Sequence, residues 1–152
     1  MENLNLPVYE FRIRQEDGAD YIFDAYRRKY VLLTPEEKVR QAFARFLVED
    51  RGYPAGLILT EQMLRLHGMV KRADILVHKP AGTPMVLVEC KAPGVPIRQA
   101  VFEQAARYNI SLQVPYLMLT NGMKHFCFRV DRPEGKVVPL EEIPFYESLR
   151  SS

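Results

Sequence analysis

Three charged residues in the middle of the chain have types and a spacing that would let them do chemistry together. Glu89 and Lys91 lie two residues apart in the apolar run 85–91, and Asp74 lies near the start of another run, 73–78. Because side chains alternate between the two faces of a strand, Glu89 and Lys91 would project from the same face. If the two runs pair, two carboxylates and one ammonium group meet at one place.

Such a group suits the hydrolysis of phosphodiester bonds. Mg²⁺ prefers oxygen ligands, keeps several of its waters and usually takes only one or two carboxylates. The metal lowers the pKa of a bound water and neutralises charge on the phosphate, while a lysine can position the water and stabilise the charged transition state. Two adjacent carboxylates repel each other unless a cation offsets them. The alternative is a solvated strand face that carries an ordinary ion pair.

The hairpin that would bring these groups together is indicated by its turn. Residues 79–84 (KPAGTP) separate the runs 73–78 (ADILVH) and 85–91 (MVLVECK), and they form a clear turn segment. The run 57–66 alternates between apolar and polar residues and predicts a further strand before them. We therefore expect three consecutive strands, of which the last two form an antiparallel hairpin.

The clearest helix in the sequence precedes these strands. Thr34 is a good N-cap and Pro35 a good first helical residue. Glu36 and Glu37 fall in the first turn, where the helix dipole favours acidic side chains, and the helix should end before Gly52. An apolar stripe follows at helical spacing, made of Val39, Ala42, Phe43, Phe46 and Leu47.

The pattern after the hairpin predicts a second helix over 97–110 and a buried strand over 115–120. Asn121-Gly122 is a strong hairpin turn signal, so residues 125–130 should pair with that strand, and a last strand should cover 136–140. The expected fold class is therefore α/β. A mixed, mostly antiparallel central sheet would be flanked by helices, with the core order α-β-β-β-α-β-β.

The N-terminal segment predicts a small β-structure of its own. Residues 8–14 alternate between apolar and polar, and residues 20–24 are a suitable hairpin partner across an Asp-Gly turn. We interpret residues 1–30 as an N-terminal β extension to a core over 34–130. The whole chain is then expected to form one domain.

Composition agrees with an ordinary globular protein. The chain has 152 residues, of which 47% are hydrophobic and 26% charged, so disorder is not expected. A formal net charge of +2 does not by itself indicate a nucleic-acid binder. Two cysteines fit neither a disulfide framework nor a zinc site, and no apolar stretch reaches the roughly 18 residues that cross a membrane. We expect a cytoplasmic protein.

Four short segments together resemble a known family. They are TPEEKVR at 34–40, RAD at 72–74, ECK at 89–91 and QAARY at 104–108. With these motifs the chain resembles the PD-(D/E)xK nuclease superfamily and, more closely, the N-terminal nuclease domain of the restriction subunit of type I restriction–modification enzymes. The resemblance implies a fold of restriction-endonuclease type and a metal-dependent endonuclease activity on DNA, as part of restriction–modification defence.

The resemblance also implies roles for single residues. Asp74 and Glu89 would hold Mg²⁺, with Mn²⁺ as a substitute, and Lys91 would be the catalytic lysine. Glu36 matches the family's helix acid, a further catalytic residue and metal ligand, because an arginine follows four residues later. Glu37 is a close second. The alternative for either acid is a purely structural one, in which it lies in the first turn because the helix dipole favours acidic side chains there.

A second group of residues is implied to line the site or support DNA binding. Gln104 and Tyr108 match the QxxxY motif and lie one helical turn apart, so they share a face. The alternative is that these two residues have no functional role and lie on the helix surface and at the edge of the core. Arg72 and Arg40 belong to the RAD and TPEEKVR segments, and a basic pair such as Lys71-Arg72 can contact phosphates or lie on a solvated surface.

The implied partners are DNA and a separate motor or specificity and methylation subunit. Restriction subunits continue into an ATP-driven motor, whereas this chain has no glycine-rich loop that ends in Gly-Lys-Ser/Thr. Two other functions remain open. One is a catalytically silent module that binds DNA or the motor partner. The other is a dimeric assembly domain in which the N-terminal β extension joins two copies.

Overall fold

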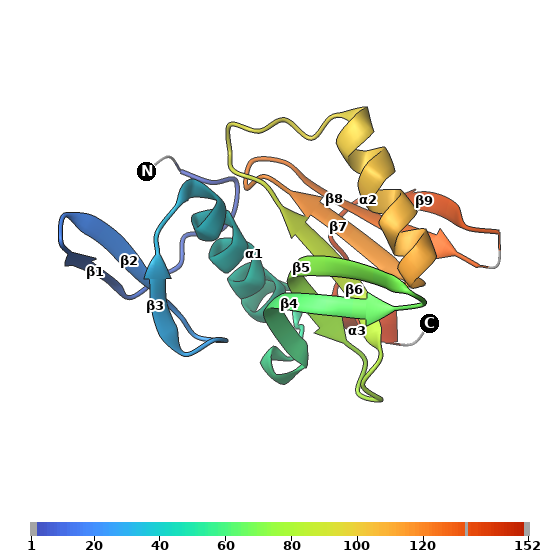
Figure 1. Cartoon of the computed structure of the whole chain (residues 1–152), viewed down its shortest axis with the longest axis horizontal. Coiled ribbons are helices and arrows are strands. Elements are labelled where there is room, and N and C mark those ends of the chain that lie inside the picture. The colour runs from blue at the N-terminus through green and yellow to red at the C-terminus, as the bar shows by residue number, and fades with distance from the viewer. Residues whose placement is uncertain (1–2, 133, 151–152) are drawn as a thin grey trace.

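A computed structural model describes residues 3–132 and 134–150 of the chain. Over these residues the strands and helices follow each other along the chain as Figure 1 shows. In order they are β1 (Ile13–Glu16), β2 (Ala19–Asp24), β3 (Lys29–Leu32), α1 (Pro35–Arg51), a 3-10 turn η1 (Ala55–Leu57), β4 (Ile58–Leu66), β5 (Met69–His78), β6 (Pro84–Cys90), α2 (Gln99–Leu112), β7 (Tyr116–Thr120), β8 (His125–Asp131), β9 (Lys136–Leu140) and α3 (Tyr146–Arg150).

A six-stranded sheet forms the centre of the molecule, in the order β4-β5-β6-β7-β8-β9. All neighbours are antiparallel except β6 and β7, which run parallel and are joined by the crossover helix α2. A parallel pair needs such a crossover because its strands begin at the same edge of the sheet. The mixed, mostly antiparallel sheet flanked by helices confirms the predicted fold class.

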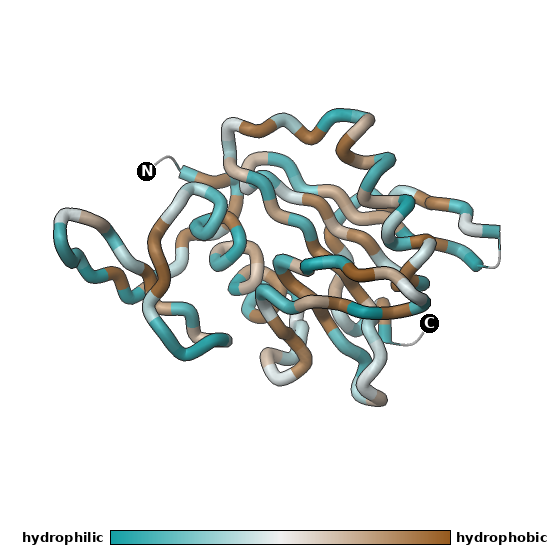
Figure 2. The backbone as a smooth tube through the Cα atoms, viewed as in Figure 1, coloured by the Kyte–Doolittle hydropathy of each residue, from teal (hydrophilic) through white to brown (hydrophobic). Residues whose placement is uncertain are grey.

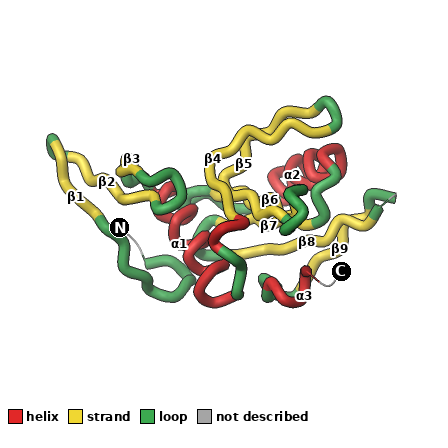
Figure 3. The backbone as a smooth tube through the Cα atoms, turned by 90° about the horizontal axis from the view of Figure 1, so that it is seen from below, coloured by secondary structure: helices red, strands yellow, loops and turns green. Residues whose placement is uncertain are grey.

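The helices cover the two faces of this sheet unequally. Helices α1 and α3 lie on one face and α2 lies on the other (Figure 3). Alternation along β6 explains this, because Val86 and Val88 pack in the cluster that holds the residues of α1, whereas Leu87 packs in the cluster of α2. Hydrophobic residues are concentrated on the central strands in Figure 2. No helix in the described part of the chain is long and apolar enough to cross a membrane.

Helix α1 begins and ends where the sequence predicts. The hydroxyl of Thr34 accepts a hydrogen bond from the backbone N–H of Glu37 at 3.0 Å, and Pro35 is the first helical residue. Gly52 ends the helix in the left-handed conformation with φ 74°, and its N–H bonds to the carbonyl of Leu47. Glycine adopts this conformation without the steric cost that a Cβ would impose.

The N-terminal residues form a separate three-stranded sheet, β1-β2-β3, which lies on the side of α1 away from the central sheet (Figure 1). The predicted hairpin around Asp17-Gly18 is confirmed, but the strand expected over 8–14 is wrong because β1 covers only Ile13–Glu16. Before it, Leu4, Leu6 and Tyr9 pack against the core cluster of α1. The alternation of this segment therefore reflects packing on a helix rather than strand pairing.

Other differences have physical reasons too. Strand β5 starts at Met69, four residues earlier than expected, because β4 and β5 continue past the residues that pair with β6 as a hairpin arm. Leu64, Leu66 and Met69 of this arm pack in the cluster that contains Leu112 of α2, a tertiary contact that the local sequence does not show. The sequence prediction also missed β3, which contains the end of a basic run, and the short helix α3. Helix α2 covers Gln99–Leu112, two residues later than predicted.

Candidate active site

The β5–β6 hairpin brings Asp74 and Glu89 to neighbouring positions, as predicted. Ile75 pairs with Val88, so the next residues along the two strands are Asp74 and Glu89. Asp74 is half-buried, and its Oδ2 accepts a hydrogen bond from the backbone N–H of Cys90 at 2.7 Å. Glu89 is only 8% exposed. Two carboxylates therefore lie side by side in a largely dehydrated part of the sheet.

Asp74 lies in an environment that disfavours its charge. Burial, together with the negative charges of Glu61, Glu36 and Glu89, raises the pKa of Asp74 to about 6. The hydrogen bond from the N–H of Cys90 acts in the opposite direction but does not outweigh them. No ion pair to Asp74 forms among residues 3–132 and 134–150. A cation at this position would remove the repulsion among the carboxylates.

Glu61 is a member of this cluster that the sequence did not reveal. It lies between the ladder pairs Thr60–Ile75 and Gln62–Ala73, which places it opposite Asp74. Its φ of 53° is left-handed and interrupts the ladder at this residue. Local distortions of a strand are common beside active sites because they redirect a side chain. In the sequence Glu61 occupies an ordinary polar position of an alternating strand, so no pattern marks it.

The cation nearest to Glu89 is Lys71 rather than Lys91. The Nζ of Lys71 lies 2.6 Å from Oε1 of Glu89 and 4.9 Å from the centre of the Tyr108 ring. Lys91 follows the last residue of β6, and its backbone N–H donates to the carbonyl of Thr120 at 2.8 Å. Among the described residues, the ammonium group of Lys91 has neither a hydrogen bond nor an ion pair. It is available to a substrate.

The two acids in the first turn of α1 differ in their contacts. Glu37 binds Arg40, accepts a hydrogen bond from Gln41 at 2.9 Å and lies 3.6 Å from a guanidinium nitrogen of Arg27. Glu36 is exposed, has no such partner in the part of the chain that the structure describes, and is close enough to raise the pKa of Asp74. Of the two acids, Glu36 is therefore the one that lies near the carboxylate cluster and has no side-chain partner among the described residues.

Arg40 connects this site to the N-terminal sheet. It is 2% exposed and binds Glu37, the Oδ2 of Asp24 at 2.9 Å and, more loosely, Glu61 at 3.6 Å. Burial would raise the pKa of Asp24, but hydrogen bonds from Arg27 and Arg40 hold it below its usual range. So deep a position would keep Arg40 out of direct contact with DNA, and a supporting role for it stays a prediction. The sequence did not indicate that Asp24 belongs to this network.

The remaining predicted residues lie at different distances from the carboxylates. Arg72 is exposed and pairs with Glu61. Tyr108 is partly buried on α2 and reaches the site through Lys71, which lies over its ring. Gln104 is exposed one helical turn away, and within the described ranges it makes no hydrogen bond to the carboxylates. The QxxxY pair therefore lies beside the site, with only the tyrosine in contact.

The donor set suits a hydrated magnesium ion better than a closed metal cage. No three His, Cys, Asp or Glu residues among those described are arranged to hold a metal. Mg²⁺ needs no such cage because it keeps several waters and takes one or two carboxylates together with substrate phosphates. Asp74 and Glu89 provide these two, and Asp74 has no competing cation. Glu89 would exchange its contact with Lys71 for the metal.

A mixed sheet with carboxylates on a central hairpin and helices on both faces defines the class of nuclease-like folds. The chain belongs to the family described as the N terminus of the type I restriction enzyme R protein, whose model matches residues 35–144. The N-terminal sheet precedes this match. Comparison with curated proteins gave no match.

Solved structures share the fold. One is a fragment of a candidate HsdR subunit of a type I restriction enzyme from Vibrio vulnificus YJ016, with 22% identity, a TM-score of 0.54, and coverage of 78% of this chain and 25% of that one. Another is a candidate DUF820 nuclease from Anabaena variabilis ATCC 29413, with 11% identity, a TM-score of 0.50, and coverage of 91% and 88%. The chain thus spans a quarter of the length of the first.

Proposed function

We propose that this chain hydrolyses phosphodiester bonds of DNA as a Mg²⁺-dependent endonuclease. The observation that carries the proposal is the half-buried Asp74, whose pKa is raised to about 6 among Glu61, Glu36 and Glu89 and which has no cation of its own. Strongly perturbed carboxylates in such a cluster are typical of functional sites. Family membership supports the same activity.

The residues of the chain have distinct roles in this reaction. Asp74 and Glu89 bind the metal, and Glu36 binds the metal or a water beside it. When bound, Mg²⁺ supplies a water of lowered pKa and neutralises charge on the phosphate. Lys91 positions the attacking water and stabilises the negative charge of the transition state through its free ammonium group. Tyr108 keeps Lys71 beside the site.

The proposed substrate is DNA, and the proposed setting is restriction–modification defence in the cytoplasm. Only 25% of the similar structure from Vibrio vulnificus is matched by this chain. We infer that translocation and target choice, where they occur, come from a motor or from a specificity and methylation subunit. Self-association into a homodimer is a further proposal that sedimentation would test.

Plasmid cleavage by the purified chain tests the proposed activity. Supercoiled DNA is incubated with Mg²⁺, Mn²⁺ or chelator, and the variants Asp74→Asn and Lys91→Ala are compared with the parent. We expect metal-dependent cleavage that falls on the order of 100-fold in each variant. Lys79→Ala is the matched control, because Lys79 lies at the turn end of the same hairpin, and it should cleave normally. Full cleavage by both site variants would refute the assignment.

One observation favours a second candidate, a silent module that binds DNA without cutting it. Lys71 already neutralises Glu89 at 2.6 Å, which is the arrangement expected of a site that no longer needs a metal. Metal titration separates the two candidates. A parent chain that binds DNA equally well with and without Mg²⁺, and shows no metal binding by calorimetry, would support the silent module.

A further inference from the structure

The N-terminal sheet carries a row of cations stacked on aromatic rings. The guanidinium of Arg12 lies 4.2 Å from the centre of the Phe23 ring, and that of Arg14 lies 4.1 Å from the centre of the Tyr30 ring. The two rings meet edge to face with centroids 5.3 Å apart. Phe23 pairs with Tyr30 across β2 and β3, so all four side chains share one face of the sheet. We call these four residues the N-terminal platform.

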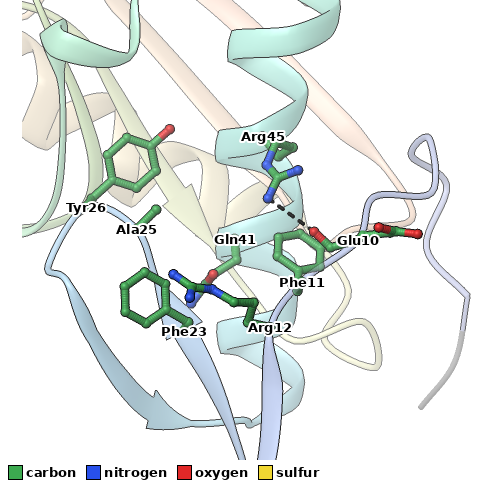
Figure 4. A pocket seen from close by; sticks show the side chains of 8 residues that line it. All are labelled: Glu10, Phe11, Arg12, Phe23, Ala25, Tyr26, Gln41 and Arg45. Atoms are coloured by element: carbon green, nitrogen blue, oxygen red, sulfur yellow. Dashed lines mark hydrogen bonds between the residues drawn. The ribbon is translucent and has the colours of Figure 1, made fainter.

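A cavity of about 260 Å³ adjoins the platform, between the N-terminal segment and α1. Figure 4 shows Arg12 and Phe23 on one side of it, Gln41 and Arg45 of α1 on another, and Phe11 beside them. Arg45 lies 4.9 Å from the centre of the Phe11 ring and donates to the carbonyl of Glu10 at 3.2 Å. The cavity thus combines flat rings with cationic and amide groups.

These side chains have the chemistry that recognises unpaired nucleotides. Aromatic rings and guanidinium planes stack on bases, and cations beside them meet phosphates. A duplex offers its phosphates but not its base faces, which are already stacked on each other. Arg12 and Arg14 are exposed, and the rings of Phe23 and Tyr30 are partly exposed. The carboxylate of Glu16 lies 3.3 Å from Arg14 and that of Glu49 lies 3.8 Å from Arg45, so each partly offsets one cation, whereas Arg12 has no ion pair among the described residues.

The platform is also attached to the candidate active site. Gln41, which lines the cavity, donates a hydrogen bond to Glu37, the neighbour of Glu36. Asp24 follows Phe23 on β2 and binds the buried Arg40, which in turn reaches Glu61. A nucleic-acid strand held on the platform would therefore lie on a sheet that these contacts connect to the carboxylate cluster.

We propose that the N-terminal platform and its cavity bind an unpaired segment of a nucleic-acid strand. A base stacks on the outer face of each guanidinium plane, which the rings of Phe23 and Tyr30 hold in place, while the N–H groups of Arg12, Arg14 and Arg45 contact the phosphates. The identity of the ligand as DNA rests on the proposed function, but binding itself does not require cleavage. This assigns a role to a sheet that precedes the residues matched by the family.

Fluorescence anisotropy in chelator tests the proposal with a labelled thymidine oligonucleotide and a blunt duplex, each of about 20 nucleotides per strand. The variants are Arg12→Gln/Arg14→Gln, which removes two cations, and Tyr30→Leu, which keeps an apolar side chain but removes the flat ring. The matched control is Lys79→Gln/Lys136→Gln, which removes two exposed cations, one in the turn between β5 and β6 and one at the start of β9, both outside the N-terminal sheet. Thermal unfolding of each variant shows that it is folded.

The expected result is a preference of the parent for the single strand. The arginine pair and Tyr30→Leu should each weaken single-strand binding by roughly tenfold, and the arginine pair should reduce the dependence of log K on log salt by about 1.4, or about 0.7 per phosphate. The control pair should bind as the parent does. Binding is measured in chelator, where metal-dependent cleavage does not occur, so failure of the proposed nuclease activity leaves this result unaffected and the two proposals stay separate.

Three outcomes would overturn the inference. The first is single-strand binding that the platform variants leave unchanged. The second is an equal loss in the Lys79→Gln/Lys136→Gln control, which would mean that only overall charge matters. The third is equal affinity for single strand and duplex with no effect of Tyr30→Leu, which would exclude base stacking.

Discussion

Replacing Asp74 with asparagine should make the metal-free protein more stable. The pKa of Asp74 is about 6, against an ordinary value of 3.8, because of burial first and then of the surrounding carboxylates. Ionising it in the folded protein therefore costs roughly 3 kcal/mol. Solvent reaches part of the side chain, so we reduce the expected gain on substitution to about 1–2 kcal/mol. Asparagine keeps an oxygen that can accept the hydrogen bond from Cys90.

The pH dependence gives this prediction its sign. A carboxyl whose pKa is raised in the folded state contributes stability that is fully present below its unfolded pKa and is lost as the pH rises through about 6. The parent should therefore lose stability between about pH 4 and pH 7 relative to Asp74→Asn. Urea unfolding in chelator, at about pH 5 and about pH 8, measures the difference, which should be larger at the higher pH.

Magnesium should reverse the order of the two proteins. A ligand that binds only the folded state at 100 times its dissociation constant adds about 2.7 kcal/mol, and only the parent retains both of the carboxylates that we propose as metal ligands. The control is Asp20→Asn, an exposed aspartate of β2, which should change stability little at either pH. The reasoning is wrong if Asp74→Asn is less stable than the parent at about pH 8 without metal, or if the difference in stability between these two proteins does not depend on pH.

Three further predictions concern the charges around the site. Arg40→Met should lower the free energy of unfolding by about 3–5 kcal/mol, because it removes the buried cation that Asp24, Glu37 and Glu61 share; a loss below about 1 kcal/mol in urea would contradict this. Asp24→Asn should flatten the acid side of the stability curve, since the lowered pKa of Asp24 gives stability that is present above its unfolded pKa and lost as the pH falls. This prediction is wrong if the free energy of unfolding of Asp24→Asn falls with decreasing pH as steeply as that of the parent. Lys71→Gln should tighten Mg²⁺ binding in calorimetry by freeing Glu89, and weaker binding would mean that Lys71 organises the site.

Local signals in the sequence were sufficient to predict the elements that carry the two central acids. The N-cap, proline and terminal glycine define α1, and the turn at 79–84 joins the strands that place Asp74 beside Glu89. These signals depend on neighbouring residues and on the alternation of side chains, which a single sequence displays directly.

The partners of those acids depend on distant residues, so the sequence did not show them. Glu61 faces Asp74 because of one left-handed residue in a strand, and no local preference marks it. Lys71, three residues before Asp74 on β5, pairs with Glu89, and no spacing in the sequence marks this contact. Asp24 reaches Arg40 across 16 residues of sequence and two elements. Each contact is set by tertiary packing rather than by periodicity.

The strand order has a consequence for the sequence of folding events. Neighbours in the central sheet follow one another along the chain, and only the parallel pair β6–β7 must wait for the crossover through α2. Closing a longer segment costs more entropy, so adjacent hairpins should form earlier than this pair. The acids Glu36, Asp74 and Glu89 all precede the crossover, whereas the backbone of Lys91 is anchored to Thr120 beyond it. Asp74 and Glu89, on adjacent strands of one hairpin, are therefore gathered first, whereas the backbone of Lys91 is fixed only when β6 and β7 pair, so that the proposed catalytic group is completed late in folding.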